Sequence, residues 1–176
     1  MHVRPLTPSD LDSYRTLMLE AYAMASDAFT STRDERAALP DAWWRKRLGE
    51  ANDLAATFGA FDNERLIGTV TMEYADRTKT RHKAHLVGMY VVPDARGVGA
   101  GRALVLAALD HARGRTGVVV VTLTHSLGNA AAAALYAACG FVAFGVEPMA
   151  IREGSRYIDK VHMQCMLCGT QSAVSP

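Results

Sequence analysis

The sequence predicts a single α/β domain built around a mixed β-sheet. Segments with the periodicity of strands alternate with helical segments along the chain, in the order β-α-α-β-β-β-α-β-α-β-β. One of them, residues 117–124, is a continuous run rich in valine, as expected for a strand covered on both faces. No internal repeat or linker divides the 176 residues, a length that suits one domain. We expect the domain to occupy residues 1–168, with a loose tail at 169–176.

The N-terminal segments are expected to form one strand and two helices. Residues 2–6 are a short candidate strand, and Thr7-Pro8-Ser9-Asp10 has the composition of a helix start, with Thr7 as the N-cap. Apolar residues then recur at helical spacing to about Ala25. The polar stretch 26–39 separates this helix from a second one within residues 40–50.

Strands and helices alternate through the rest of the chain. Residues 62–64 are a turn signal between two strand-like runs and therefore predict a β-hairpin. Gly114 and Gly140 stand where two apolar helices are expected to end. The predicted elements are, in order, strands 55–61, 65–75 and 85–92, helix 102–113, strand 117–124, helix 129–139, and strands 141–147 and 156–167.

The composition is that of an ordinary globular domain, with 49% hydrophobic residues, 21% charged residues and a formal net charge of +1. Proteins that bind nucleic acids or membrane surfaces usually carry a strong basic excess, so neither partner is expected. No apolar run approaches the roughly 20 residues that span a bilayer, and the N-terminus lacks the apolar core of a signal peptide. A cytoplasmic location is therefore the default expectation.

The three cysteines do not form a disulfide framework. Cys165 and Cys168 form a single C-x-x-C, with His162 three residues earlier, which raises the alternative of a zinc or redox site. However, the segment has the pattern of a strand, in which positions three apart point to opposite faces. A structural zinc site also needs four ligands on one centre. We therefore expect no metal.

A glycine-rich segment connects the strand at 85–92 to the helix at 102–113. In VVPDARGVGAGRAL, residues 91–104, three glycines alternate with other residues and two arginines flank them. This arrangement can bind a phosphate, because the first turn of a helix has unpaired N–H groups and a partial positive charge. Glycine also lets a bulky anion come close to those groups. The spacing is that of neither a P-loop nor a dinucleotide fingerprint. A flexible surface turn is the alternative interpretation.

A second motif follows the first at the start of the next predicted helix. NAAAAALYAACGF, residues 129–141, has the pattern N-x-x-A-x-x-L-Y-x-x-x-G-F, and residues 96–101 have the pattern [RQ]-x-x-G-x-[GA]. With these two motifs in this order, the sequence resembles the GNAT superfamily of acyl-CoA-dependent N-acyltransferases. The resemblance covers most of the chain. It implies a mixed, mostly antiparallel sheet whose fourth and fifth strands splay apart to hold the acyl-CoA.

The resemblance also implies which residues bind acyl-CoA. Backbone groups of residues 89–91 would pair with pantetheine as a further strand would, and the amides of residues 98–103 would cradle the pyrophosphate. Gly88 is consistent with a bulge or a close approach, and Asn129 has an ordinary N-cap as its alternative role. The implied set is Met89, Tyr90, Val91, Arg96, Gly97, Val98, Gly99, Ala100, Gly101, Arg102, Ala103, Asn129 and Tyr136.

Tyr136 matches the family's tyrosine that protonates or hydrogen-bonds the coenzyme A sulfur. A phenol is protonated at neutral pH, as a general acid must be; packing in the core is its alternative role. Thr124 stands where some relatives carry a glutamate base. We expect His85, at the place where other relatives have a glutamate, to be the base, because imidazole titrates near neutrality. Glu73, His125 and an ordered water remain open alternatives, and His85 would otherwise be only a polar strand end.

The acceptor site is expected opposite the cofactor, between the first two helices and the last strands. Its candidate lining residues are Phe29, Trp43, Trp44 and Tyr157, although core packing is favoured for the two tryptophans. Glu147, Glu35 or Asp34 would attract a cationic amine, but each is better explained as a solvated surface charge.

The expected function is that of an N-acetyltransferase which uses acetyl-CoA as co-substrate and acts on a primary amine. A small molecule, an antibiotic-like polyamine and a peptide or protein N-terminus all remain open as acceptors. The alternative is a catalytically degenerate acyl-CoA sensor; a different phosphate-binding module is disfavoured by the paired motifs. A homodimer is an expectation from the family alone.

Overall fold

The computed structural model describes residues 1–49 and 53–167. The strands are β1 (His2–Pro5), β2 (Ala55–Asp62), β3 (Arg65–Tyr74), β4 (Lys83–Val91), β5 (Val120–Ser126), β6 (Val142–Glu153) and β7 (Arg156–Met166). The α-helices are α1 (Leu11–Met24), α2 (Arg33–Ala37), α3 (Asp41–Arg47), α4 (Ala100–Gly114) and α5 (Ala130–Ala138). Short 3-10 turns are η1 (Pro8–Asp10), η2 (Ser26–Ala28) and η3 (Pro93–Ala95).

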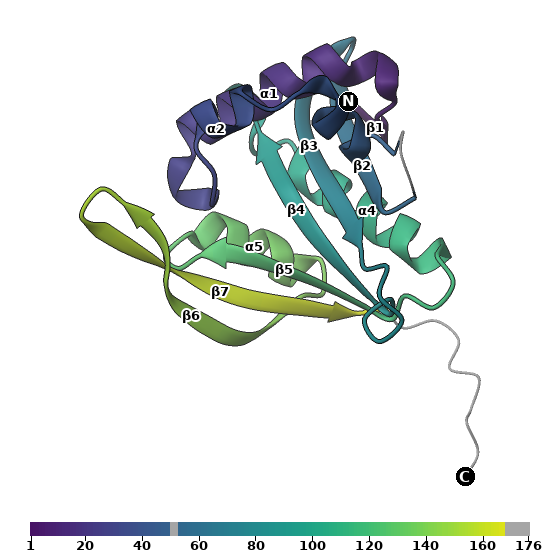
Figure 1. Ribbon diagram of the computed structural model, residues 1–176. Helices are drawn as coiled ribbons and strands as arrows, with labels where there is room; N and C mark the ends of the chain where they lie inside the picture. The colour runs from purple at the N-terminus through teal and green to yellow at the C-terminus, as the bar shows by residue number, and fades with distance from the viewer. Residues whose placement is uncertain (50–52, 168–176) are drawn as a thin grey trace.

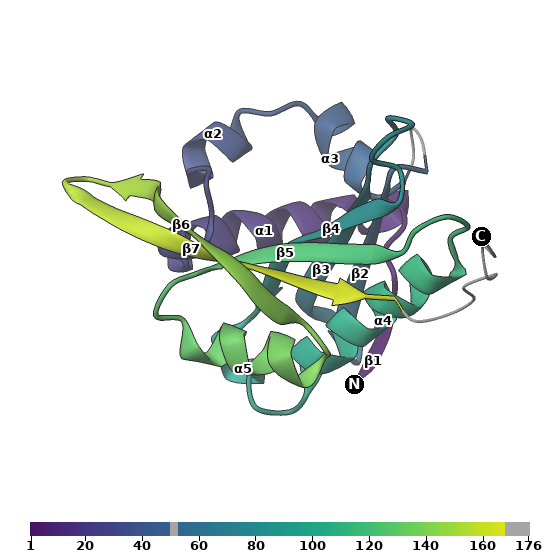
Figure 2. The same ribbon diagram turned by 90° about the horizontal axis from the view of Figure 1, so that it is seen from below.

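The seven strands form one twisted sheet in the order β1-β2-β3-β4-β5-β7-β6 (Figure 1). Every neighbouring pair is antiparallel except β4 and β5, which run parallel. This confirms the predicted mixed, mostly antiparallel sheet. Helices α2 and α3 lie on one side of the sheet, and α4 and α5 lie on the other (Figure 2). Each side buries its own core, with Tyr14 and Trp44 on the first side and Leu104 and Leu109 on the second.

The β4–β5 pair opens after three residues. His85 and Thr122 are the last partners in the register, yet β4 continues to Val91 and β5 to Ser126. The predicted splay is therefore confirmed. A bulge contributes to it, because the register of β3 and β4 shifts at Gly88, which has a φ of +62°. An extra residue in one strand bends that strand and increases its twist.

Three local features differ from the sequence prediction. The polar stretch 26–39 contains α2, whose capping box joins Thr32 and Glu35; a five-residue helix is too short to show an apolar period. Helix α4 does not end before Gly114 but includes it. Strand β6 runs past the predicted end at 147, because a register shift lets it continue pairing to Glu153. Residues 50–52 and 168–176, including the expected tail, lie outside the described residues.

Candidate active site

The splay opens into a cavity of about 1020 Å³. Its walls come from β4, β5, the first turn of α4 and the cavity-facing part of α5, from the end of α1 and the segment that joins it to α3, and from parts of α3, β6 and β7. The lining includes residues of α2 and α3 and residues of α4 and α5, and these two pairs of helices lie on opposite sides of the sheet (Figure 2). It therefore has one end at the glycine-rich loop and another end at α2 and α3.

The glycine-rich loop holds the first turn of α4 open to the cavity. Gly97 and Gly99 have φ values of +82° and +86°, and a Cβ atom at either position would meet no atom within 4 Å. Gly99 is the N-cap of α4, so the N–H groups of the next three residues have no partner within the helix. These amides, the positive end of the helix dipole and the empty space beside the glycines together suit a bulky anion.

The structure brings nearly all of the predicted site residues to this one cavity. Those in its lining are His85, Met89, Tyr90, Val91, Arg96, Gly97, Gly99, Ala100, Gly101, Arg102, Asn129 and Tyr136. Val98 and Ala103 are outside the lining. The Val98 side chain is 64% exposed to solvent, and the Ala103 amide donates to the Gly99 carbonyl at 3.0 Å. The amides that are free to bind an anion are thus fewer than those of residues 98–103, which the sequence predicted to hold the pyrophosphate.

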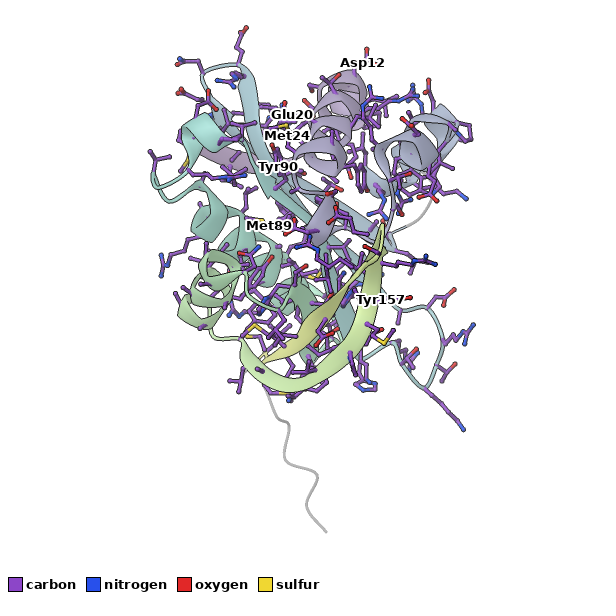
Figure 3. All side chains as sticks on the ribbon, turned by 90° about the vertical axis from the view of Figure 1, so that its left-hand side faces the viewer. Asp12, Glu20, Met24, Met89, Tyr90 and Tyr157 are labelled. Carbon is purple, nitrogen blue, oxygen red and sulfur yellow. The ribbon has the colours of Figure 1, made fainter. Side chains whose placement is uncertain are left out.

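Side chains at the end of β4 contact α1 on one side of the sheet and α4 on the other. The hydroxyl of Tyr90 donates to Glu20 at 3.1 Å, and Figure 3 shows Tyr90 beside Glu20 and Met24 of α1. The neighbouring Met89 lies on the α4 side, where its Cε would be 3.1 Å from a Cβ at Gly101. Arg96 donates from Nε to the Val91 carbonyl at 3.0 Å and lies over the Tyr90 ring. The strand edge and the loop are therefore held as one unit.

Tyr136 projects from α5 and is only 6% exposed. Its ring makes an edge contact with Phe141, with ring centroids 5.9 Å apart, and lies 6.2 Å from the His125 ring. Burial raises the pKa of Tyr136 to about 12, so the phenol stays protonated across the physiological range. Asn129 caps the same helix by accepting from the Ala132 amide at 3.0 Å. Asn129 therefore has the N-cap role that was its alternative interpretation, and its contact with acyl-CoA stays a prediction.

His85 is half-buried, and its ring contacts a hydroxyl of the neighbouring strand. Its Nδ1 lies 2.9 Å from the Thr122 hydroxyl, which itself donates to the Ala84 carbonyl at 3.3 Å. A hydroxyl that donates to the Ala84 carbonyl can accept from Nδ1–H, and in that tautomer Nε2 keeps its lone pair. Burial lowers the pKa of His85, while the carboxylate of Glu73 opposes this shift. The neutral imidazole is thus the form present at physiological pH.

The other candidate bases lie in different surroundings. Glu73 faces His85 across the β3–β4 pair, but its carboxylate forms an ion pair with Arg47 at 3.0 Å and it is not in the cavity lining. His125 does line the cavity, and its Nδ1 donates to the Ser126 carbonyl at 3.0 Å. Thr124 is in the lining as well. His125 consequently remains an alternative base on geometric grounds.

The predicted acceptor residues separate into two groups. Phe29 lines the cavity, whereas Trp44 is fully buried in the core and makes an edge contact with Tyr14. Tyr157 is 48% exposed on the β6–β7 hairpin, outside the lining (Figure 3). Trp43 also lies outside this lining.

Among the predicted acidic groups, only Glu147 lines the cavity. The carboxylate of Glu35 accepts from the Thr32 amide at 2.8 Å in the α2 capping box, and Asp34 is a surface residue beside Arg33. Three cationic residues of the lining were missed by the sequence analysis: Arg36, Arg47 and Lys160. No local pattern distinguishes them from surface charges.

Among residues 1–49 and 53–167, no three His, Cys, Asp or Glu side chains are grouped so that they could hold a metal ion. His162 binds Glu147 through Nε2 at 2.9 Å, and Cys165 is buried. Cys168 of the C-x-x-C pair lies outside the described residues. None of the helices in the described part of the chain has the length and apolar character to cross a membrane.

Comparison with known proteins gives a family match and a curated relative. The family model described as "Acetyltransferase (GNAT) family" matches residues 18–141. A phosphinothricin N-acetyltransferase from Alcaligenes faecalis is 38% identical over 76 residues, which are 43% of this chain. The matched region spans only 39% of the length of that relative.

Solved structures share the fold at low sequence identity. The chain superimposes on a ribosomal-protein-alanine N-acetyltransferase from Brucella melitensis with a TM-score of 0.78 and 24% identity, over 95% of this chain and 100% of the other. It superimposes on yncA, a putative acetyltransferase from Salmonella typhimurium in complex with its cofactor acetyl-CoA, with a TM-score of 0.80 and 22% identity. That alignment covers 100% of this chain and 99% of the other.

Proposed function

The chain belongs to the GNAT acetyltransferase family, and we propose that it is an N-acetyltransferase which transfers the acetyl group of acetyl-CoA to a primary amine. One observation carries the proposal. A single cavity contains the unpaired edge of β4, the open first turn of α4, the imidazole of His85 and the phenol of Tyr136. These groups match the requirements of acyl transfer between a thioester and an amine.

The glycine-rich loop and β4 supply the binding groups for the co-substrate. Acetyl-CoA, when bound, supplies an activated thioester carbonyl and a thiolate leaving group. The amides of Ala100, Gly101 and Arg102 hold the pyrophosphate, with Arg96 adding charge. Backbone groups of residues 89–91 pair with the pantetheine arm, and an N–H of this edge polarises the carbonyl oxygen. Fixing β4 through Tyr90 and Arg96 keeps that N–H in place during the reaction.

His85 is the proposed base. Its Nε2 carries the free lone pair and accepts the proton of the acceptor's ammonium group, directly or through one water. The contact between Nδ1 and Thr122 keeps the ring in the tautomer that this role requires. Burial favours the uncharged imidazole, so the base is in its active form at neutral pH.

Tyr136 is the proposed donor to the departing sulfur. The pKa of the Tyr136 phenol is about 12, whereas that of a thiol is near 8.5. Full transfer of the proton from the phenol to the thiolate would therefore cost roughly 5 kcal/mol. Its main contribution is therefore a hydrogen bond that stabilises negative charge on sulfur, with the phenol keeping its proton. This choice follows from the burial of the hydroxyl, which penalises the phenolate.

The relatives suggest two acceptors for direct trial. One is phosphinothricin, after the name of the curated relative, and the other is a peptide with an N-terminal alanine, after the Brucella melitensis enzyme. Neither the sequence identity to these relatives nor the coverage of their chains decides between the two acceptors.

A homodimer and a cytoplasmic location also remain proposals. The exposed edge strand β6, with Val142, Phe144 and Val146 facing solvent, supports the homodimer.

The experiment that tests the proposal measures thiol release from acetyl-CoA with a panel of amines, in the parent and in Tyr136→Phe. We expect acceptor-dependent thiol release, and a fall in kcat of about 10²-fold or more in the variant, the usual effect of losing one hydrogen-bond donor to developing negative charge, with little change in acetyl-CoA affinity. Tyr157→Phe is the matched control, because that exposed hydroxyl lies outside the cavity. An acyl-CoA sensor would instead bind acetyl-CoA tightly without thiol release, which would refute the enzyme.

A further inference from the structure

Lys160 is the one buried lysine of the four in the chain. Lys46, Lys79 and Lys83 are exposed to solvent, whereas Lys160 is only 8% exposed and lies in the lining of the cavity. A buried lysine can lose its proton, whereas a guanidinium group cannot. The cavity of the proposed N-acetyltransferase therefore contains a primary amine of its own.

The strand register places Lys160 at the level of the open edge of β4. His85 and Thr122 are the last partners of the parallel β4–β5 pair. Strands advance by about 3.3 Å per residue, so Met89 of β4 and Ser126 of β5, each four residues further on, reach a similar height. Ser126 is paired with Lys160 of β7. Lys160 thus lies level with the segment whose free N–H groups are proposed to polarise the thioester carbonyl.

The Lys160 side chain lies on the face of the sheet that carries the proposed base. The Thr122 hydroxyl contacts the His85 ring, and side chains four residues apart on one strand point to the same face, so Ser126 shares that face. Directly paired residues of neighbouring strands also share a face, which adds Lys160. The positive charge of Lys160 contributes to the lowered pKa of His85. The amine and the imidazole are therefore close enough to interact electrostatically.

The segment that follows α1 is tied down beside this amine. The Ser126 hydroxyl donates to the Asp27 carbonyl and the Ser26 hydroxyl donates to Glu153, both at 2.5 Å. Burial lowers the pKa of Lys160, and the carboxylate of Glu147 opposes this shift. A lower pKa increases the fraction of the amine that is neutral and so able to act as a nucleophile.

The Nζ atom of Lys160 has no hydrogen-bond or ion-pair partner within the part of the chain that the structure describes. Glu147 is its neighbour in the β6–β7 pair, but that carboxylate binds His162 at 2.9 Å. Nζ is also not one of the unpaired polar atoms that are sealed from solvent in residues 1–49 and 53–167. It is therefore open to the cavity that Lys160 lines.

We propose that Lys160 is a site of self-acetylation, at which the protein transfers the acetyl group of bound acetyl-CoA to its own Nζ when no acceptor occupies the cavity. The inference rests on the proposed N-acetyltransferase function and adds a modification site to it. The neutral amine attacks the thioester carbonyl carbon, so that a C–N bond forms and the C–S bond breaks. One proton passes from the nitrogen, by way of His85, to the sulfur. The products are N-acetyl-lysine and the thiol of coenzyme A.

Acetylation would change the acceptor end of the cavity in two ways. It removes the positive charge that contributes to the lowered pKa of His85, and it adds a neutral group where an acceptor amine would otherwise lie. The new amide is stable in water, so the change persists. The modified protein is therefore a blocked form that accumulates when acetyl-CoA is plentiful and the acceptor is scarce.

Mass spectrometry tests the site directly. The protein is incubated with acetyl-CoA in an amine-free buffer, and peptide mapping follows the acetylation of each lysine over time. We expect Lys160 to be acetylated about 100-fold or more faster than Lys83, because it is held beside the bound thioester whereas Lys83 meets acetyl-CoA only from solution. Dilution of the protein should not change the rate per molecule. Excess free coenzyme A should slow the reaction at Lys160 and not at Lys83.

Three variants separate self-acetylation from the chemical acetylation of surface lysines. Lys160→Arg keeps the positive charge without a nucleophilic amine, and its total acetylation should fall to that of the exposed lysines. Lys83→Arg is the matched control, because Lys83 is exposed and outside the cavity lining; it should be acetylated at Lys160 as the parent is. Tyr136→Phe should slow acetylation of Lys160 by about 10²-fold and leave that of Lys83 unchanged. Thermal unfolding of each variant checks that the fold is kept.

The outcomes distinguish the inference from the proposed function. Fast acetylation of Lys160 supports the inference even if none of the added amines is an acceptor. Thiol release with an added amine, together with acetylation of Lys160 no faster than that of Lys83, would overturn the inference and leave the N-acetyltransferase proposal intact. Absence of both thiol release and acetylation of Lys160 would overturn the inference together with the proposal.

Discussion

The proposed role of His85 as the base depends on its neighbours, and not only on its residue type, because they set its protonation. The Thr122 hydroxyl lies 2.9 Å from Nδ1, which suits the tautomer with a free Nε2, and burial lowers the pKa of the ring below the usual value. Glu73 limits this shift from across the β3–β4 pair, and Arg47 in turn holds Glu73. The cost of a lower pKa is a weaker base, and the benefit is that the base is unprotonated throughout the neutral range.

This environment predicts the pH dependence of the reaction. A base whose pKa is lowered in the folded protein is active above that pKa and is lost as the pH falls through it. We therefore expect kcat/KM to rise with pH along a limb whose apparent pKa lies below the usual 6.5 of histidine. His85→Gln should flatten that limb and lower kcat by about 10²-fold or more, with one acceptor used throughout so that its own ionisation cancels.

His125→Gln is the matched comparison, since His125 lines the same cavity but is held by a backbone carbonyl. The His125→Gln variant should keep the rising limb of the pH profile of kcat/KM. The assignment to His85 would be wrong if the limb disappeared in His125→Gln and persisted in His85→Gln.

Sequence alone could identify the residues whose spacing is tied to backbone geometry. Asn129 stands at a helix N-cap, and the glycines of the loop lie at positive φ values or against another side chain, so their positions leave a readable pattern. Arg36 and Arg47 leave none. They are basic residues on short helices, and only the folded chain brings them together at the Trp43 ring and into the cavity lining.

At the scale of elements, the β4–α4 junction depends on three glycines in different ways. Gly97 and Gly99 adopt positive φ values, so a side chain there strains the backbone as well as filling the cavity. Gly101 lies inside the helix, where a Cβ would be 3.1 Å from Met89 Cε and 3.2 Å from Leu135 Cδ2. Both of these atoms are the ends of flexible side chains, which can move. Gly101 is therefore the position at which bulk can be added with the least effect on the fold.

We predict that Gly101→Val raises the dissociation constant of acetyl-CoA by about 10-fold or more, because the new side chain covers the amides of the first turn. The thermal midpoint should change little. Gly114→Val, in the last turn of the same helix, has open space around its Cβ and should leave the affinity unchanged. Calorimetry on the two folded variants makes the comparison. If the two variants bound acetyl-CoA with equal affinity, the loop would not be part of the binding site.

Elements were predictable where their pattern is long. The β2–β3 hairpin and α4 follow from turn residues and apolar periodicity, and both are present. Helix α2 was missed because it has only five residues and no buried side chain. The full length of β6 was missed for another reason. Its residues are almost all exposed, so no alternation of buried and exposed positions marks the strand, and a register shift interrupts its pairing.

At the scale of the whole molecule, function depends on a sheet that is opened in the middle while both of its faces stay packed. The bulge at Gly88 bends β4 away from β5, and the strands on either side keep the two halves in one sheet. The cavity at this opening is lined by the first turn of α4 and by residues of α2 and α3, which lie on opposite sides of the sheet (Figure 2). The order of the two motifs predicts the topology and the acyl-CoA end. The chemistry of the other end comes from segments that meet only in the folded chain.

The measurement that tests the central claim most directly is hydrogen–deuterium exchange with and without acetyl-CoA. If the co-substrate lies in the splay, the amides of residues 86–91 and 97–102 should exchange more slowly in its presence, because they gain hydrogen-bond partners or lose contact with water. The β1–β2 pair, which is distant from the cavity lining, should be unchanged. Saturating acetyl-CoA with no protection in either segment, or with protection elsewhere, would contradict the account.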